Sequence, residues 1–216
     1  MSLKTIRYKL KYTKDSMPGL DAINNKLKEV YAGQEPKHWA TIVPYELGGE
    51  DPLWATKIYK SDKEPQHLHY LTLGFTNLFY DPEFAKDEVN GFGFELTFRY
   101  IPTVDEIAEP IWPMNFLGNI SKYVFSSKKA FDEGHYMSAN GPLCTGADTE
   151  VTAFAFCLDP ELGEIETPHG SMKFLQVFGL TGQEYQDIRD KKYSVAELLD
   201  RHRLTNPLLI TDLNRK

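Results

Sequence analysis

The 216-residue sequence is poor in cysteine, has no long hydrophobic run and carries no excess of positive charge. Its two cysteines, Cys144 in a turn-like segment and Cys157 in an apolar one, are too few and too differently placed for a disulfide framework. The longest apolar run, near 151–158, is far shorter than the roughly 20 residues that a membrane helix needs. We therefore expect a soluble protein of the reducing cytoplasm, without disulfides or membrane-spanning helices.

The charge balance argues against two classes of partner. Acidic residues outnumber basic ones by 31 to 24, which gives a net charge of -7. Because negative charge repels phosphate backbones and anionic lipid headgroups, we expect no nucleic-acid partner and no membrane partner. The first 15 residues are basic, but no apolar stretch follows them, so they lack the centre of a secretory signal. Two acidic segments, near 81–88 and 105–109, would suit a basic partner protein.

No segment has the spacing of a common catalytic or cofactor motif. Gly91 and Gly93 lack the third glycine of a dinucleotide fingerprint, and a strand pattern rather than a helix follows them. The serines have no nucleophile-elbow context, and the apolar run around Cys157 should keep its thiol protonated. We expect no enzymatic activity and no cofactor.

Two histidines, His67 and His69, fall on one face of a predicted strand. This spacing can hold zinc when a third and a fourth ligand converge on it. The remaining histidines and the cysteines show no recognised zinc spacing, which favours structural histidines. A metal-binding enzyme or sensor centred on His67 and His69 is the alternative interpretation.

Aromatic residues are abundant, with 13 Phe and 12 Tyr, and they are densest at 91–100. Residues 92–100 alternate between large apolar side chains and polar or small ones, which predicts a strand with one apolar face. The polar positions of this strand include Glu95 and Arg99. We expect both to face water.

Other patterns outline the remaining elements. Strand patterns cover 6–12, 41–45, 55–60, 67–75, 151–158, 172–180 and 208–211, and helical spacing covers 18–31 and 113–131. Residues 181–184 and 194–197 are capping boxes that begin two more helices. Without repeats or a composition break, these elements predict one α+β domain at 18–216. Residues 1–17 are then an N-terminal extension that contains an edge strand.

Aromatic and charged side chains mix around the end of the predicted helix at 113–131. Tyr123, His135 and Tyr136 belong to this group. Such a mixture is typical of the hot spots of protein interfaces, and equally of core residues with one polar tip. We take these three as the candidate partner-binding residues.

Several ordered motifs resemble the suppressor of fused domain family over about 19–212. They are LGGxDPL at 47–53, HxHY at 67–70, GFGFELTFR at 91–99, YVF at 123–125, TPxG at 167–170, FLQ at 174–176 and LITD at 209–212. The chain looks like a bacterial single-domain member. The resemblance implies a mixed, largely antiparallel sheet flanked by helices, as in the family's N-terminal lobe, and binding rather than turnover.

The resemblance also implies a kind of partner. In animals the family's two-lobed protein restrains Gli transcription factors by clamping a short peptide as an added β-strand between its lobes. Tyr123 matches the tyrosine of that face, and His135 stands where the family has its acidic partner. Single-lobe relatives in bacteria look like immunity proteins that silence a toxin made by a neighbouring gene. We therefore predict a cytoplasmic immunity protein, with a peptide-binding regulator like animal suppressor of fused as an alternative.

Overall fold

The computed structural model describes residues 2–43, 45, 48–102 and 110–216, and a mixed eight-stranded sheet forms its centre. The strand order is β1-β2-β3-β4-β8-β6-β5, and β7 pairs with β8 outside this path. β4 and β8 pair in parallel, whereas the other pairs are antiparallel. The strands are β1 Lys37–Ala40, β2 Ala55–Ser61, β3 His67–Leu73, β4 Val89–Tyr100, β5 Tyr136–Ser138, β6 Val151–Leu158, β7 Glu164–Thr167 and β8 Gly170–Thr181.

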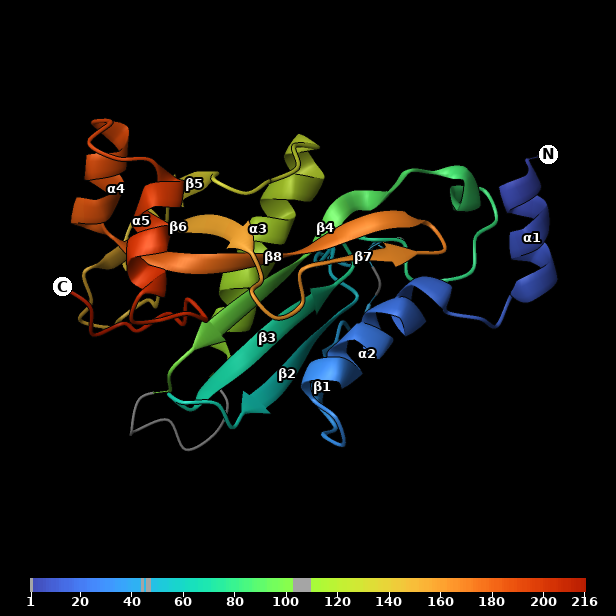
Figure 1. Ribbon diagram of the computed structural model, residues 1–216, viewed down its shortest axis with the longest axis horizontal. Coiled ribbons are helices and arrows are strands. Elements are labelled where there is room, and N and C mark those ends of the chain that lie inside the picture. Colours follow the sequence, from blue (N-terminus) through green and yellow to red (C-terminus); the bar gives the residue numbers. More distant parts are fainter. Residues whose placement is uncertain (1, 44, 46–47, 103–109) are drawn as a thin grey trace.

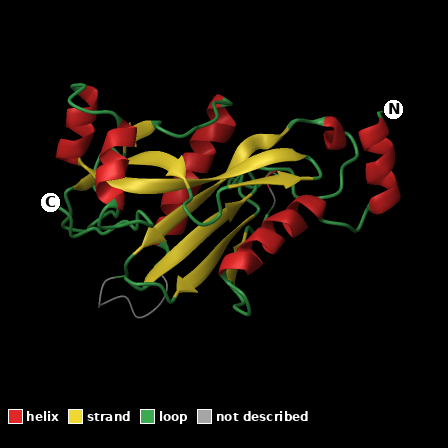
Figure 2. Ribbon diagram, in the orientation of Figure 1, coloured by secondary structure: helices red, strands yellow, loops and turns green. Residues whose placement is uncertain are grey.

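Helices lie on both faces of this sheet (Figures 1 and 2). α3 packs on one face, and α2, α4 and α5 pack on the other. The helices are α1 Leu3–Lys11, α2 Pro18–Val30, the short 3-10 helix η2 Phe84–Lys86, α3 Trp112–Ser127, α4 Gly182–Arg189 and α5 Val195–Arg203. The predicted α+β class, with a largely antiparallel sheet flanked by helices, is confirmed.

The aromatic strand β4 supplies the core beneath α3. Phe94, Leu96, Phe98 and Tyr100 are at most 2% exposed, as the alternation predicted. The ring of Phe98 meets Phe116 of α3 edge-on, with centroids 5.6 Å apart. Edge-to-face contacts of this kind stabilise aromatic clusters beyond the area that they bury.

The polar side chains on the other face of β4 do not face water, so that part of the prediction was wrong. Glu95 and Arg99 are both 0% exposed. The sequence pattern showed only that β4 has one apolar face. The second face of the sheet is covered by α2 at one end and by α4 and α5 at the other, and the polar side chains of β4 lie between these two apolar clusters. Both charges are therefore buried and must be satisfied inside the protein.

The N-terminal segment is also different from its prediction. Residues 6–12 do not form an edge strand, because α1 is helical from Leu3 to Lys11. The side chain of Ser2 caps this helix by accepting from the backbone N of Thr5 at 3.1 Å. The ring of Tyr8 also meets that of Tyr12, the residue directly after the helix, with centroids 4.9 Å apart. In the structure α1 packs beside η2, so the alternation of 6–12 did not mark a strand.

Most other elements follow their predictions, with three differences. The edge strand predicted at 41–45 lies instead at Lys37–Ala40, and Pro44 falls outside the described residues. The segment 208–211 contributes one isolated bridge, between Thr211 and Tyr100, rather than a strand. α3 ends at Ser127, earlier than predicted, because Lys128 adopts the left-handed conformation with φ 57°. The acidic segment 105–109 lies outside the described residues.

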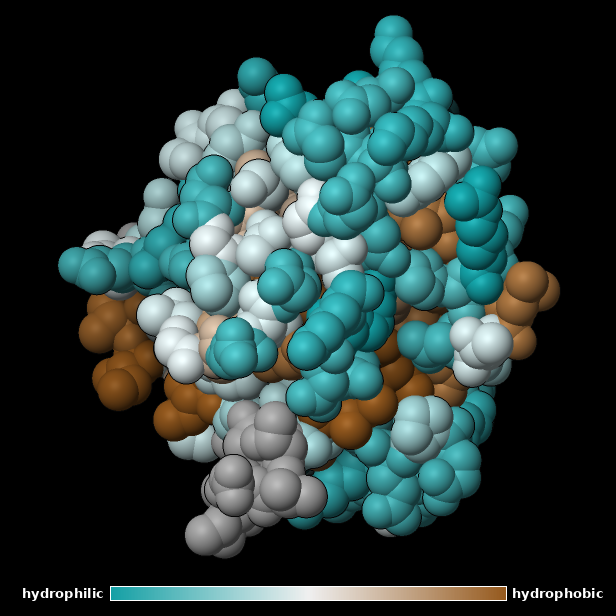
Figure 3. Space-filling view, turned by 90° about the vertical axis from the view of Figure 1, so that its left-hand side faces the viewer, coloured by the Kyte–Doolittle hydropathy of each residue, from teal (hydrophilic) through white to brown (hydrophobic). Residues whose placement is uncertain are grey.

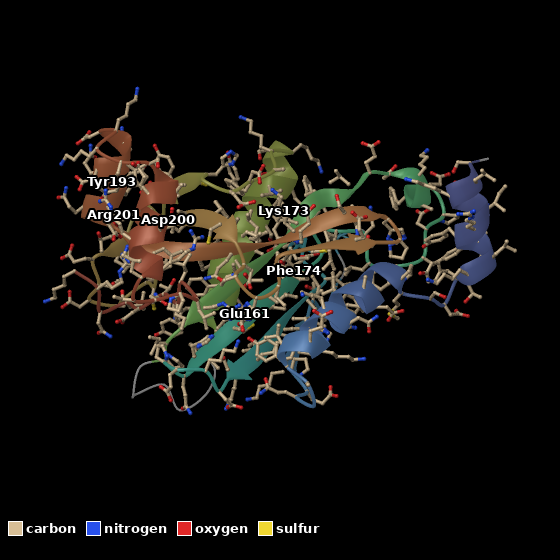
Figure 4. The ribbon with its side chains drawn as sticks, in the orientation of Figure 1. Glu161, Lys173, Phe174, Tyr193, Asp200 and Arg201 are labelled. Atoms are coloured by element: carbon tan, nitrogen blue, oxygen red, sulfur yellow. The ribbon has the colours of Figure 1, made fainter. Side chains whose placement is uncertain are left out.

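The two capping boxes are confirmed. The hydroxyl of Thr181 accepts from the backbone N of Glu184, and that of Ser194 accepts from the backbone N of Glu197. Each glutamate side chain reaches back to the backbone of its cap. At the corner between these helices, the guanidinium of Arg201 lies 4.8 Å from the ring centroid of Tyr193 (Figure 4).

Candidate partner-binding face

α3 presents one row of side chains away from the core. Its apolar residues, such as Phe116, Ile120 and Val124, point into the sheet. Asn115, Asn119 and Tyr123 follow one another at intervals of four residues on a neighbouring side of the helix, as the helical period requires. Pro113 in the first turn needs no backbone donor there and lets the helix begin directly after Ile111.

A groove of about 370 Å³ lies between this row and the segment 137–145. Its lining contains no charged side chain. The lining residues are Trp112, Asn115, Phe116, Asn119, Ile120, Tyr123, Phe131, Met137, Ser138, Ala139, Pro142, Leu143, Thr145 and Phe154. The groove is therefore apolar with a few amide and hydroxyl groups, a composition that suits an uncharged stretch of polypeptide.

A stack of aromatic rings supports the rim of the groove. Tyr123 is 41% exposed and stacks on Phe131, with centroids 5.7 Å apart and planes 25° apart. Phe131 stacks in turn on the fully buried Phe156 at 4.3 Å. Tyr123 is thus the accessible end of a rigid column that reaches the core, which is how an interface anchor is held in place.

His135 lies beside this column. Its ring meets Phe131 edge-on at 6.3 Å, and its Nδ1 accepts from the backbone N of Asp132 at 3.1 Å. A neutral His135 therefore carries its proton on Nε2 and offers a donor to a partner. The turn that carries it is tied to β8, because Lys173 Nζ contacts Asp132 at 2.9 Å and Glu133 at 3.1 Å. The hydrogen bond from Lys173 also lowers the pKa of Asp132.

The three residues predicted as a partner-binding group do not form one cluster. Tyr123 and His135 are joined through Phe131, but the side chain of Tyr136 lies on the opposite face of the sheet, where its ring meets Tyr185 of α4 at 5.8 Å. The reason is the period of two in β5, which sends Met137 into the groove and Tyr136 away from it.

Among the described residues β5 is an edge strand of the sheet, next to the groove that Met137 and Ser138 line. β5 is the last strand of the sheet and pairs with β6 on one side. His135 O accepts from Phe156 N, and Ala139 N donates to Thr152 O, both at 2.9 Å. Since alternate residues of a strand point their backbone groups to opposite sides, Tyr136 and Ser138 direct theirs outward. An extended segment can add to the sheet there.

The two histidines of β3 are structural. His69 is 1% exposed, its Nδ1 lies 2.7 Å from the hydroxyl of Tyr31, and its Nε2 lies 3.1 Å from Oδ2 of Asp159. His67 is 3% exposed and its Nδ1 contacts the carbonyl of Pro65 at 2.8 Å. Among the described residues no three His, Cys, Asp or Glu side chains gather as metal ligands. The contacts of His67 and His69 with neighbouring protein groups thus favour structural roles for both.

Burial and neighbouring charges set the protonation of His69 and Asp159. Burial and then the charge of Arg99 lower the pKa of His69, so its imidazole is neutral at pH 7. Burial by itself would raise the pKa of Asp159, but the contacts with His69 and Arg99 hold it well below its usual range. Because His69 is neutral, the cation that balances Asp159 is Arg99. Sequence reasoning missed this network, since nothing at Asp159 marks it as a partner of residues 60 or 90 positions away.

The groove itself was missed as well. Tyr123 and Phe131 stood out in the sequence as aromatics, but Asn115, Asn119 and Met137 did not. The interval of four from 115 to 119 to 123 is a signal that could have placed the two asparagines beside Tyr123. The opposite wall, on 137–145, follows only from the tertiary fold.

Comparison with known proteins agrees with this architecture. Residues 49–216 match the family described as suppressor of fused protein. The suppressor of fused homolog of Homo sapiens is 34% identical over 209 residues, which cover 91% of this chain and 43% of that protein. The chain thus spans less than half the length of this curated relative.

Solved structures of suppressor of fused proteins have a similar fold. A chain in a crystal structure of the Sufu-Fu complex superposes with a TM-score of 0.84 at 28% identity, covering 93% of this chain and 92% of that one. A putative homolog from Neisseria gonorrhoeae superposes with a TM-score of 0.61 at 13% identity, covering 92% and 95% of the two chains, which shows a shared fold alone. A bacterial origin for this chain stays a prediction.

None of the described helices combines the length and the apolar character that crossing a membrane requires.

Proposed function

The chain belongs to the suppressor of fused family, and from this premise we propose that it is a non-enzymatic binding module that holds an extended segment of a partner protein along β5. Homologues in this family are protein-binding regulators, and family members are typically not enzymes. One homologous chain comes from a complex with Fu. The observation that carries the proposal is a free sheet edge at Tyr136 and Ser138 beside an uncharged groove that ends in Tyr123.

Each part of the face has a distinct role in this proposal. The outward backbone groups of Tyr136 and Ser138 bind the main chain of the partner as an added strand, which supplies affinity with little sequence preference. The ring of Tyr123 and the groove beside it receive alternate side chains and supply selectivity. His135 Nε2 offers a donor where the family has an acidic residue, so the partner should present an acceptor at that point.

The experiment is a peptide-display selection on this chain, followed by calorimetric titration of the selected peptide. Tyr123→Ala removes the aromatic anchor, and Ser138→Pro removes an outward N–H without touching the bonds to β6. Trp39→Ala is the matched control, because Trp39 is 51% exposed on the opposite edge strand β1. We expect each test variant to weaken binding by about tenfold or more and the control to be neutral. The proposal fails if Trp39→Ala abolishes binding while Tyr123→Ala and Ser138→Pro do not.

The toxin-neutralising role is a finer proposal within the same class. Its support is the net charge of -7, which favours association with a basic protein. The rim near Tyr123 carries Lys122, Lys128 and Lys129, so a basic toxin would bind on another surface. Co-expression with the product of each adjacent gene tests this role. Rescue of growth by this chain from one toxic neighbour supports it, and the absence of any toxic neighbour or complex removes it.

A further inference from the structure

α1 lies at one end of the molecule, outside the sheet (Figure 1). Its buried side chain is Tyr8. Tyr8 is 5% exposed, and its hydroxyl lies 2.7 Å from His169 Nε2 and accepts from the backbone N of Asp81 at 3.1 Å. Its ring also packs against Tyr80, with centroids 5.4 Å apart. The Tyr8 side of α1 therefore faces the protein.

The side of α1 opposite Tyr8 carries three aliphatic side chains in solvent. Leu3 is 76% exposed, Ile6 42% and Leu10 83%. With about 100° between successive residues, these three positions fall within one narrow arc, and Tyr8 projects roughly opposite to it. We call these three residues the aliphatic stripe. A single exposed leucine is ordinary, but three on one line of one helix leave an apolar face unpartnered.

Cations border the aliphatic stripe. Arg7 projects on one side of it and Lys9 on the other, with Lys4 and Lys11 farther round the helix. All four are exposed, and none forms an ion pair with a described residue. Residues 2–14 contain no acidic side chain. The local charge is therefore positive on a protein whose net charge is negative, so the net charge, from which we expected no membrane partner, does not describe this surface.

The nearest acidic segment does not neutralise this surface. Residues 81–88 carry Asp81, Glu83, Asp87 and Glu88, and this segment binds α1 through the contact of Asp81 with Tyr8. It therefore lies on the anchored side of the helix, away from the aliphatic stripe. The opposite end of the molecule, around α4 and α5, is covered mainly by hydrophilic side chains (Figure 3).

We propose that α1 is a contact site for the surface of an anionic membrane. The aliphatic stripe enters the boundary between headgroups and acyl chains, while Arg7 and Lys9 on its flanks, with Lys4 and Lys11, bind lipid phosphates and carboxylates. α1 lies at one end of the molecule, and the stripe is on the side opposite Tyr8, so a flat surface can approach it. Three aliphatic side chains and four cations give weak, reversible binding rather than an anchor. Finding a helix in place of the predicted strand is what brings these residues onto one line.

Flotation with lipid vesicles tests the proposal on the full chain. We expect binding to vesicles of phosphatidylcholine and phosphatidylserine, little binding to phosphatidylcholine alone, and release by salt. The triple variant Leu3→Ser, Ile6→Ser, Leu10→Ser removes the stripe, and Leu204→Ser is its control, because Leu204 is 85% exposed beyond the end of α5. The variant Lys4→Glu, Arg7→Glu keeps helix propensity and places acids near the helix N-terminus, where they are tolerated. Its control is Lys28→Glu, Glu29→Lys on α2.

The outcomes separate membrane binding from the alternatives. We expect the stripe variant to lose vesicle binding and the charge variant to bind about tenfold more weakly or worse, since each basic residue near an anionic surface contributes about fivefold. Both controls should bind like the parent chain, and circular dichroism should show all variants folded. Equal binding to neutral and anionic vesicles, or no binding at all, overturns the proposal. Stripe-dependent self-association without vesicle binding also overturns it, because a second copy of the chain would then cover α1.

Discussion

Arg99 and Asp159 form an ion pair in the middle of the protein, in which one guanidinium nitrogen, Nη2, donates to both carboxylate oxygens at 2.8 and 3.0 Å. Both side chains are shielded from solvent, at 0% and 1% exposure. Thr97 Oγ1 and the backbone N of Glu161 and of Leu162 also donate to Asp159. The pair joins the strand β4 to the turn after β6, between the two apolar clusters of that face.

We predict that breaking this pair destabilises the fold strongly. Asp159→Ala removes the carboxylate that faces Nη2 of Arg99 and leaves Glu161, 2.9 Å from Nη1, as the remaining acidic partner of this buried charge. The loss should lower the free energy of unfolding by about 3 kcal/mol. Thr97→Val is the matched control, because it removes one neutral donor to the same carboxylate and should cost about 1 kcal/mol. Urea denaturation followed by circular dichroism measures both. Equal costs for the two variants would contradict a role for the buried charge.

Glu95 gives a prediction about pH. Burial raises the pKa of Glu95 to about 7 from its ordinary 4.5, although Thr72, Gly74 and Thr76 donate to its carboxylate. The folded state binds the proton of Glu95 more tightly than the unfolded chain does. The stabilisation that protonated Glu95 provides is therefore complete below pH 4.5 and is lost as the pH rises through 7. The loss amounts to about 3 kcal/mol.

The variant Glu95→Gln isolates this effect. A neutral amide does not lose a proton, so the stability of the variant relative to the parent chain should rise between pH 5 and pH 8. Denaturation at several pH values measures the difference. A difference that stays constant across this range would show that Glu95 does not titrate there.

The pH dependence of stability that His67 causes should be opposite to that of Glu95. Burial, and after it the charge of Arg99, lowers the pKa of His67 to about 4 from its ordinary 6.5. Its contribution to stability is present above pH 6.5 and is lost as the pH falls through 4, because the unfolded chain takes up the proton first. His67→Gln should therefore flatten the acid side of the stability curve. NMR titration of the imidazole checks the pKa directly, and a midpoint at 6 or above would disprove this assignment.

In the stack of Tyr123, Phe131 and Phe156, we predict that stability depends on the middle ring much more than on the exposed one. Phe131 is the middle ring between Tyr123 and the buried Phe156, so Phe131→Ala should destabilise the protein by about 2–4 kcal/mol. Tyr123→Ala removes the exposed end of the column and should cost less than about 1 kcal/mol. Thermal denaturation compares the two. If Tyr123→Ala proves as costly as Phe131→Ala, Tyr123 belongs to the core and its effect on binding has no simple meaning.

The family was predicted correctly from the motifs alone, because ordered motifs such as 91–99 and 209–212 extend over most of the chain. The motifs did not give the partner. The face around Tyr123 consists of exposed side chains of α3, the turn that Lys173 contacts and the edge strand β5. What this face can bind depends on all three segments. A partner-binding role for Tyr136 stays a prediction. Its ring lies on the other face of the sheet, because closeness in sequence to His135 does not decide which side of a strand a side chain takes.

The amino-acid sequence by itself determined the elements whose signals are local. The alternation of 92–100, the helical spacing from Pro18 and the capping boxes at Thr181 and Ser194 each act within a few residues, so they specify a strand or a helix start without knowledge of the rest of the chain.

The tertiary structure alone decided what covers each surface. Whether Arg99 meets water or Asp159, and whether residues 3–11 find a strand partner or coil into α1, depends on segments far away along the chain. The physical reason is that burial is a property of the assembled layers: α2, α4 and α5 close the second face of the sheet, and only then must its charges pair with each other.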